Sequence, residues 1–391
     1  MSLRLLTAGE SHGRGLVGIL EGLPAGVPIS PKAVADELAR RRLGHGRSGR
    51  QKLEADTLEI VSGVRHGRTL GSPIAVAIAN AEWEEKYRDL MNVEGEIDPA
   101  DRLTRPRPGH ADLAGTLKYG FDDVRDVLER ASARETATRV ALGAFCKALL
   151  AELGIRIVSH VVRIGSVASR SRRLPGPDDV EAVDASPVRC FDPAVSERMV
   201  AEIDRIRADR DTVGGVFEVV AHGCPPGLGS HVHFDRKLDA RLALALMSIQ
   251  SVKGVEVGDG FASAARPGSK AHDEILPGLR RSSARAGGIE GGTSTGQPIR
   301  VRAAMKPFST VPSPLSTVDL STGEPALAIG QRTDICAVPA GAVVGEAVVA
   351  HVLADAALEK FGGDSLAETR RNLDAFVAGL SSRQRVAQPD R

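Results

Sequence analysis

The amino-acid sequence predicts a mixed α/β fold. Short segments of apolar and β-branched residues recur along the 391-residue chain, and long stretches with helical periodicity separate some of them. Apolar residues make up 42% of the chain, which is enough to build a sizeable core. Because several strand candidates alternate or follow one another in short meanders, a mixed sheet is favoured over a parallel doubly wound one.

Each element is predicted from its residue pattern and from the glycine, proline or serine that bounds it. Serine caps a helix well and proline fits its first position, so Ser30 and Pro31 predict a helix start. Gly44 ends that helix after Arg42. In chain order, strands are predicted at 3–7, 16–20, 57–61, 74–78, 156–162, 216–221, 252–257 and 299–304, and long helices at 31–42, 133–153, 194–207, 237–249 and 342–361.

The start of the 133–153 helix supports two interpretations. Ser132 is placed to cap it, and Glu135 three residues later would complete a capping box. The same helix end, flanked by Arg130 and Arg134, is equally suited to hold an anion.

A weak internal repeat suggests two related halves. Residues 16–26 align without gaps with residues 217–227, and both contain a strand followed by Gly-x-Pro-x-Gly. We expect one domain over residues 1–381, and the repeat, unless it is chance similarity, divides it into halves at about 1–165 and 190–381. Residues 382–391 are expected to form a disordered tail.

Composition excludes several classes of function. Aromatic residues are only 3% of the chain and the net charge is +1, so neither a nucleic-acid partner nor a membrane partner is expected. The four cysteines have no paired spacing, so we expect buried thiols in a reducing compartment and no metal site. With no apolar signal segment at the start of the sequence, a cytoplasmic location is predicted.

Two histidines lie beside glycines in separate motifs, Gly-Glu-Ser-His-Gly at 9–13 and Arg-Pro-Gly-His-Ala-Asp at 107–112. Histidine exchanges protons near neutral pH, and glycine lets the backbone approach a ligand closely. The first motif also matches the G-x-S-x-G nucleophile elbow of serine hydrolases, but at most one strand precedes it, whereas an elbow needs a sheet beneath it. A serine hydrolase therefore stays only as an alternative.

Arginine outnumbers lysine by 41 to 10 among the 51 basic residues. GC-rich coding is one explanation, and bidentate recognition of phosphate and carboxylate is another. Residues 40–50 contain five arginines among three glycines, which fits either a solvated helix end or a loop that grips an anion.

The densest glycine cluster, residues 286–296, lacks the spacing of the usual dinucleotide and P-loop signatures. A lysine and two hydroxyl residues follow at 306–310, and an arginine stands near a carboxylate at 331–334.

Taken in order, these motifs resemble those of the chorismate synthase family, and the resemblance runs from about residue 3 to residue 375. The matching segments are GESHG at 9–13, RPGHAD at 107–112, ERASARETA at 129–137, GIEGGTSTGQPIRVRAAMKP at 288–307, QRTDICAVPA at 331–340 and EKFGGDS at 359–365.

The resemblance implies a lyase of the shikimate pathway. Members of the family convert 5-enolpyruvylshikimate 3-phosphate into chorismate and phosphate by a 1,4-anti elimination. They require reduced FMN, and it is open whether this chain reduces its FMN with NADPH or depends on an external flavin reductase. The implied fold is a β-α-β sandwich of two antiparallel sheets that enclose long helices, with pseudo-symmetric halves, assembled as a homotetramer.

The resemblance also implies roles for residues of this sequence. His12 would serve the leaving phosphate, His110 would serve the reduced flavin, and Asp334 would assist flavin N5 as a base; the two histidine roles are interchangeable on sequence grounds. Ser132 completes the implied catalytic set. Implied substrate-binding residues are Arg41, Arg47, Arg105, Arg107, Arg134 and Arg332. Implied cofactor-binding residues are Arg41, Arg47, Arg130, Ala131, Ser132, Gln250, Ser251, Gly291, Lys306, Pro307, Phe308, Ser309, Thr310 and Arg332.

One further alternative stays open, a flavin- or nucleotide-binding protein that kept the fold and lost catalysis. The presence of both histidines speaks against it, because a protein that only binds a ligand needs no proton donor.

Overall fold

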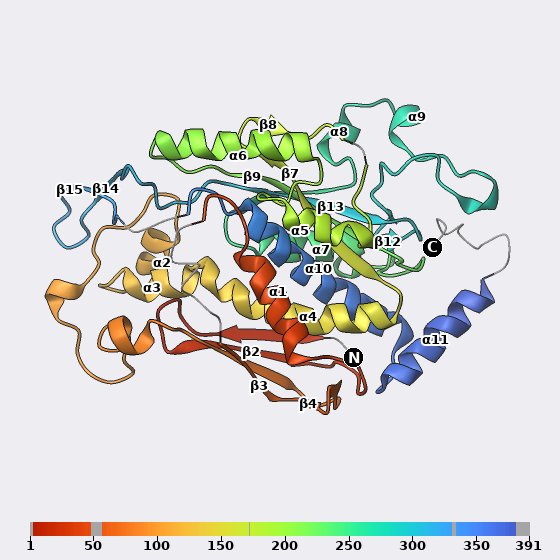
Figure 1. Cartoon of the computed structure of the whole chain (residues 1–391), viewed down its shortest axis with the longest axis horizontal. Helices are drawn as coiled ribbons and strands as arrows, with labels where there is room; N and C mark the ends of the chain where they lie inside the picture. Colours follow the sequence, from red (N-terminus) through yellow and green to blue (C-terminus); the bar gives the residue numbers. More distant parts are fainter. Residues whose placement is uncertain (1–2, 48–56, 172, 331–333, 381–391) are drawn as a thin grey trace.

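Two antiparallel sheets enclose the long helices (Figure 1). The computed structural model describes residues 3–47, 57–171, 173–330 and 334–380. The sandwich predicted from the family resemblance is confirmed, as is the mixed α/β class predicted from the residue patterns.

The smaller sheet has the strand order β1-β2-β6-β3, and all its pairs are antiparallel. Along β2, Leu16 and Leu20 are buried on the inner face, while Val17 and Ile19 are exposed on the outer face. This alternation is the period-two pattern of a sheet covered on one side. Its strands are β1 (Arg4–Ala8), β2 (Gly15–Glu21), β3 (Thr57–Ser62) and β6 (Ile74–Ala79).

The larger sheet has the order β10-β13-β9-β7-β8 and is also antiparallel throughout. Helix α6 (Pro193–Ala208) lies along the upper edge of the view in Figure 1, over this sheet. The strands are β7 (Arg156–Ile164), β8 (Val167–Ala168), β9 (Gly215–His222), β10 (Val252–Val257) and β13 (Ile299–Met305).

Helices α1 (Pro31–Arg42), α4 (Thr136–Glu152) and α10 (Val338–Phe361) lie between the sheets (Figure 1). Helix α4 packs against β2 and β6, and α10 packs against β7, β9 and α4. The two helices approach closely where Gly143 faces Ala347: a Cβ on Gly143 would lie 2.5 Å from the Cβ of Ala347. Glycine is needed there for the backbones to meet.

Helix α10 is long and apolar enough to cross a membrane, yet 89% of its most apolar 18-residue stretch is buried inside the fold. Side chains of both sheets and the enclosed helices form one contiguous apolar cluster. The hydropathy of α10 is therefore that of a core helix.

The remaining elements surround this frame. Helices are α2 (Asp112–Tyr119), α3 (Arg125–Ala131), α5 (Val180–Ala185), α7 (Leu238–Met247), α8 (Phe261–Ala264), α9 (Gly268–Ala271) and α11 (Leu366–Gly379). Two-stranded ladders are β4 (Val64–Arg65) with β5 (Arg68–Thr69), β11 (Ile289–Glu290) with β12 (Thr293–Ser294), and β14 (Ser316–Val318) with β15 (Pro325–Leu327). Short 3-10 turns are Pro99–Asp101, Ala133–Glu135, Pro177–Asp179, Phe234–Arg236 and Pro277–Leu279, and Trp83–Tyr87 is a π-helical turn.

The predicted strands and long helices all form, with ends that shift by a few residues. Ser30 caps α1 by accepting a hydrogen bond from the backbone N of Ala33. The four cysteines are buried free thiols, and burial raises the pKa of Cys146 to about 12. The predicted tail, residues 382–391, lies outside the described residues.

The predicted capping box at Ser132 is wrong. Ser132 accepts a hydrogen bond from the backbone N of Arg134 and caps a 3-10 turn over residues 133–135, after which α4 begins. The carboxylate of Glu135 instead accepts from the Nε2 of Gln250 at 2.8 Å and pairs with Arg139 at 2.8 Å. A tertiary partner, Gln250, and a partner one helical turn away, Arg139, therefore bind the carboxylate that the capping box would have used.

Candidate active site

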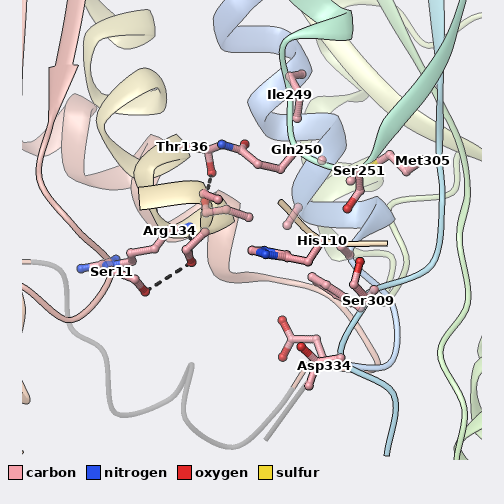
Figure 2. A pocket seen from close by; sticks show the side chains of 18 of the residues that line it. Ser11, His110, Arg134, Thr136, Ile249, Gln250, Ser251, Met305, Ser309 and Asp334 are labelled. Atoms are coloured by element: carbon pink, nitrogen blue, oxygen red, sulfur yellow. Dashed lines mark hydrogen bonds between the residues drawn. The ribbon is translucent and has the colours of Figure 1, made fainter. Parts of the chain in front are cut away.

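A cavity of about 400 Å³ opens at one end of the helical layer. It lies at the N-terminal ends of α4 and α10, where the helix dipoles favour an anion. In Figure 2, Ser11 and Arg134 line one side, Ser251 and Ser309 line the other, and the imidazole of His110 lies between them. The walls thus come from segments distant in the sequence.

His12 lies in the turn between β1 and β2. Gly9 has φ +100°, and a Cβ there would lie 2.3 Å from the carbonyl oxygen of Gly15, so this turn requires glycine. The Nδ1 of His12 is 2.7 Å from Oε2 of Glu129, which also accepts from the His12 backbone N at 3.0 Å. The Nε2 is buried without a hydrogen-bond partner among the described residues, and His12 lines the cavity. The second ring nitrogen is therefore available to a ligand.

His110 is held in a similar way at the start of α2. Its Nδ1 contacts Oδ1 of Asp112, and Arg107 reaches the same nitrogen at 3.1 Å and donates to Asp112 through Nε at 2.8 Å. Burial raises the pKa of Asp112, but the hydrogen bonds from His110 and Arg107 outweigh burial and hold this pKa well below its ordinary value. Asp112 therefore stays ionised beside the imidazole.

The cavity is strongly cationic. Five lysine and arginine side chains line it, and Asp334 is the only carboxylate among its lining residues in the described part of the chain. The basic residues are Arg41, Arg47, Arg107, Arg134 and Lys306. Burial, and then the charge of Lys253, lowers the pKa of Lys306. A ligand that carries several negative charges is the electrostatic complement of this site.

Several of these cations are pre-oriented by the protein. Arg41 donates through Nε to the Oγ1 of Thr136 at 3.0 Å and through Nη2 to the carbonyl oxygen of Ala133 at 3.0 Å. Arg47 pairs with Asp334 at 3.4 Å. Side chains fixed before a ligand arrives lose less conformational entropy on binding it.

Hydroxyl and amide groups complete the polar lining. The Oγ of Ser132 donates to the Oγ of Ser11 at 3.3 Å. The Oε1 of Gln250 is buried without a hydrogen-bond partner among the described residues. Ser251 has φ +69°, a left-handed conformation that is uncommon for serine, and such strain often marks a ligand site. Among the described residues, no group of three histidine, cysteine or acidic side chains is arranged to hold a metal ion.

The structure brings most of the predicted site residues into this one cavity. They are His12, Arg41, Arg47, Arg107, His110, Ala131, Ser132, Arg134, Gln250, Ser251, Lys306, Phe308, Ser309, Thr310 and Asp334.

Four predicted residues lie elsewhere in this chain. Arg105 is half exposed and lies 3.6 Å from Asp319. Arg130 donates to the carbonyl oxygen of Gly9 at 3.0 Å. Gly291 lies in the turn between β11 and β12, and Pro307 lines a neighbouring cavity. Arg332 lies outside the described residues, as do residues 48–50 of the arginine-rich run.

The carboxylates that hold the histidines have no role among those implied by the sequence. Asp112 closes the Arg-Pro-Gly-His-Ala-Asp motif two residues after His110, so the sequence did carry a signal for it, whereas Glu129 opens a motif 117 residues from His12 and nothing near it marks the contact. Asn80 donates to the carbonyl oxygen of Gly13 at 2.5 Å and accepts from Nη2 of Arg134 at 3.1 Å, and no motif marked it.

The nucleophile-elbow interpretation fails on topology. The segment 9–13 joins two antiparallel strands, β1 and β2, whereas an elbow joins a strand to a helix. His12 pairs with Glu129, and the hydroxyl of Ser11 accepts from Ser132.

Comparison with known proteins agrees with the motifs. A family model described as chorismate synthase matches residues 3–358. The chain is 59% identical over 393 residues to the chorismate synthase of Salinispora tropica, which covers 97% of this chain and 99% of that protein. It is 60% identical over 390 residues to the chorismate synthase of Thermobifida fusca, with the same coverage. A crystal structure of chorismate synthase superimposes with a TM-score of 0.77 at 42% identity, covering 97% of this chain and 98% of that one.

Proposed function

Because the chain belongs to the chorismate synthase family of lyases, we propose that it converts 5-enolpyruvylshikimate 3-phosphate into chorismate and phosphate, with reduced FMN as an obligatory cofactor. The reaction is a 1,4-anti elimination in the shikimate pathway of aromatic amino acid biosynthesis.

The observation that carries this proposal is the charge of the cavity. The substrate bears a phosphate and two carboxylates, and among the described residues that line the cavity five basic side chains outnumber one carboxylate. Arginine suits this task because its planar fork matches both anion types. Arg41, Arg107 and Arg134 are proposed to bind the substrate, and Arg47 binds it or the reductant.

The lining residues also fit a flavin. The partnerless Oε1 of Gln250 is an acceptor for a ring N–H, and the hydroxyls of Ser251, Ser309 and Thr310 can meet polar edges of the cofactor. An apolar wall suited to an aromatic ring system comes from Ile249, Met305, Ala337, Ala340 and Val344. Ala131, Ser132, Lys306 and Phe308 are proposed to contribute to the same site. Reduced FMN, when bound, supplies electron density and a nitrogen base for the ring proton.

Two histidines supply protons from fixed positions. With Nδ1 held against the carboxylate of Glu129, His12 presents Nε2 to the cavity, where the protonated ring can stabilise and protonate the departing phosphate. His110, held by Asp112, stabilises the charge of the reduced cofactor, and Asp334 accepts a proton on that side. Ser132, hydrogen-bonded to Ser11, orients a ligand group at the 3-10 turn.

The experiment that tests this function mixes the protein anaerobically with the enolpyruvyl substrate and chemically reduced FMN, and follows chorismate by absorbance. Product is expected with reduced FMN and none with oxidised FMN. A repeat with oxidised FMN and NADPH alone separates self-reduction from dependence on an external flavin reductase. FMN binding without product would instead support a binding protein.

The histidine assignment predicts that His12→Ala and His110→Ala each lower turnover by about 10–1000-fold, because each variant loses a positioned proton donor or acceptor. Single-turnover rates of chorismate formation measure this loss. Wild-type-like turnover in either variant would remove the proposed role of that residue.

We further propose that the enzyme works as a homotetramer in the cytoplasm. Light scattering of the purified protein measures the assembly directly.

A further inference from the structure

One aromatic side chain contacts a proposed catalytic histidine from outside the family motifs. The ring of Tyr87 stacks on the imidazole of His12, with ring centroids 4.1 Å apart and ring planes 29° from parallel. Such stacking stabilises an aromatic pair beyond the burial of its area.

Tyr87 reaches His12 from a π-helical turn, Trp83–Tyr87, in the segment that follows β6. The turn closes through the backbone N of Arg88, which donates to the carbonyl oxygen of Trp83 at 2.9 Å. π-Helical turns are rare and often lie at functional sites, because they redirect a side chain that a regular helix would place elsewhere.

The start of this segment is attached to the turn that carries His12. The backbone N of Trp83 donates to the carbonyl oxygen of Asn80, and the side chain of Asn80 donates to the carbonyl oxygen of Gly13 at 2.5 Å. The tyrosine and the histidine therefore sit on two segments that are hydrogen-bonded to each other.

His12 is thus constrained at three places. Its backbone N and its Nδ1 are held by Glu129, and one ring face is covered by Tyr87. The side chain is only 12% exposed, and the buried Nε2 is left for the cavity. Glu129 alone fixes one atom of the ring, and rotation about the Cβ–Cγ bond is limited by what lies against the ring face.

We propose that Tyr87 is a positioning residue for His12: its ring covers one face of the imidazole, keeps water from that face and holds Nε2 toward the cavity. The inference rests on the proposed function only where it predicts a loss of turnover. The shielding of His12 is itself a property of the free protein. The ring carries this role, so phenylalanine can replace tyrosine.

Shielding is measured by the rate at which diethyl pyrocarbonate carbethoxylates His12. The reagent transfers its ethoxycarbonyl group to an unprotonated imidazole nitrogen, with loss of ethanol and carbon dioxide. Tryptic peptide 5–14 contains His12 as its only histidine, and peptide 103–118 contains only His110. Mass spectrometry then gives both rates from one sample, and His110 in the same cavity is the internal reference.

Tyr87→Ala is expected to raise the His12 rate several-fold relative to His110, while Tyr87→Phe stays close to wild type. Arg88→Ala is the matched control, because it removes a large exposed side chain from the same turn and is expected to change neither rate. Tyr87→Gln, which also lacks the ring, replaces the alanine variant should that one fail to fold.

An unchanged ratio of the His12 labelling rate to the His110 labelling rate in Tyr87→Ala would overturn the proposal. An equal rise in both labelling rates leaves that ratio unchanged and would mean that the whole cavity had opened. In turnover, Tyr87→Ala is expected to lower kcat more than it raises KM, and Tyr87→Phe is expected to restore kcat. If the wild-type protein makes no chorismate, the proposed function fails, yet the labelling ratio still decides whether Tyr87 shields His12.

Discussion

At the scale of single residues, both histidines are held by the same kind of contact. Each has its Nδ1 against a buried carboxylate, Glu129 for His12 and Asp112 for His110. A carboxylate at one nitrogen fixes the tautomer and the ring orientation. The chemistry therefore depends on residues that need not touch the substrate.

Glu129→Gln is expected to lower turnover by about 10–100-fold while the protein stays folded, because the amide can still hydrogen-bond but no longer stabilises the imidazolium. Steady-state kcat with saturating reduced FMN measures the effect.

The matched control is Asp126→Asn, on the same helix α3, where the side chain is in neither the cavity nor the His12 contact. Equal losses in both variants would mean that α3 itself had been disturbed.

At the scale of elements, a buried ionic cluster joins the central helices. Glu346 of α10 is completely buried and pairs with Arg40 of α1 at 2.8 Å and with Lys147 of α4 at 2.5 Å. Its other oxygen accepts from the Nη2 of Arg189 at 3.2 Å and from the Oγ of Ser159 at 2.6 Å. Arg40 thus points into the core, while its neighbour Arg41 points into the cavity.

Burial raises the pKa of Glu346, but the charges of Lys147, Arg40 and Arg189 outweigh burial and lower this pKa well below its ordinary value. The carboxylate is therefore ionised at neutral pH, and it compensates three buried or half-buried cations.

Glu346→Ala is expected to destabilise the protein by about 3–5 kcal/mol, because it leaves these cations buried without their shared partner. Urea unfolding followed by circular dichroism measures the loss. Lys32→Ala, which breaks the exposed Lys32–Asp36 pair on α1, should leave the midpoint almost unchanged. Similar midpoints for the two variants would contradict a stabilising role of the buried cluster.

At the scale of the whole molecule, the cavity forms where the two sheets and the helical layer between them end together. The turn between β1 and β2 contributes from the smaller sheet, the end of β13 contributes from the larger one, and α4 and α10 direct their N-termini between them. Both helix dipoles therefore add to the positive potential that the basic side chains create.

Carboxylates with lowered pKa values, Asp112, Glu218 and Glu346, couple the stability of the fold to pH. Because a folded-state pKa below the unfolded value stabilises the protein only while the group is ionised, their contribution is complete above the ordinary values of 3.8 and 4.5. It is lost as the pH falls through the lower folded-state values.

The melting temperature is therefore expected to fall as the pH is lowered below about 4.5. In Glu346→Gln the fall should be less steep, because one of the coupled groups no longer titrates. Differential scanning calorimetry between pH 7 and pH 3 checks both expectations, and a melting temperature independent of pH over this range would contradict them.

The sequence by itself determined the elements that depend on neighbouring residues. Ser30 caps α1, Gly44 follows its end, and the strand predicted at 16–20 forms as β2, because caps and strand preferences act within a few residues. The motifs also identified most of the cavity residues, since the family resemblance carries information that local physics does not.

Only the tertiary structure decided how distant groups meet. Glu135 binds Gln250 in place of the predicted capping box, Glu129 holds His12, and Tyr87 covers His12. These contacts join residues up to 117 positions apart. They follow from how two sheets enclose α4 and α10, and such packing is decided by the whole core rather than by any one segment of the chain.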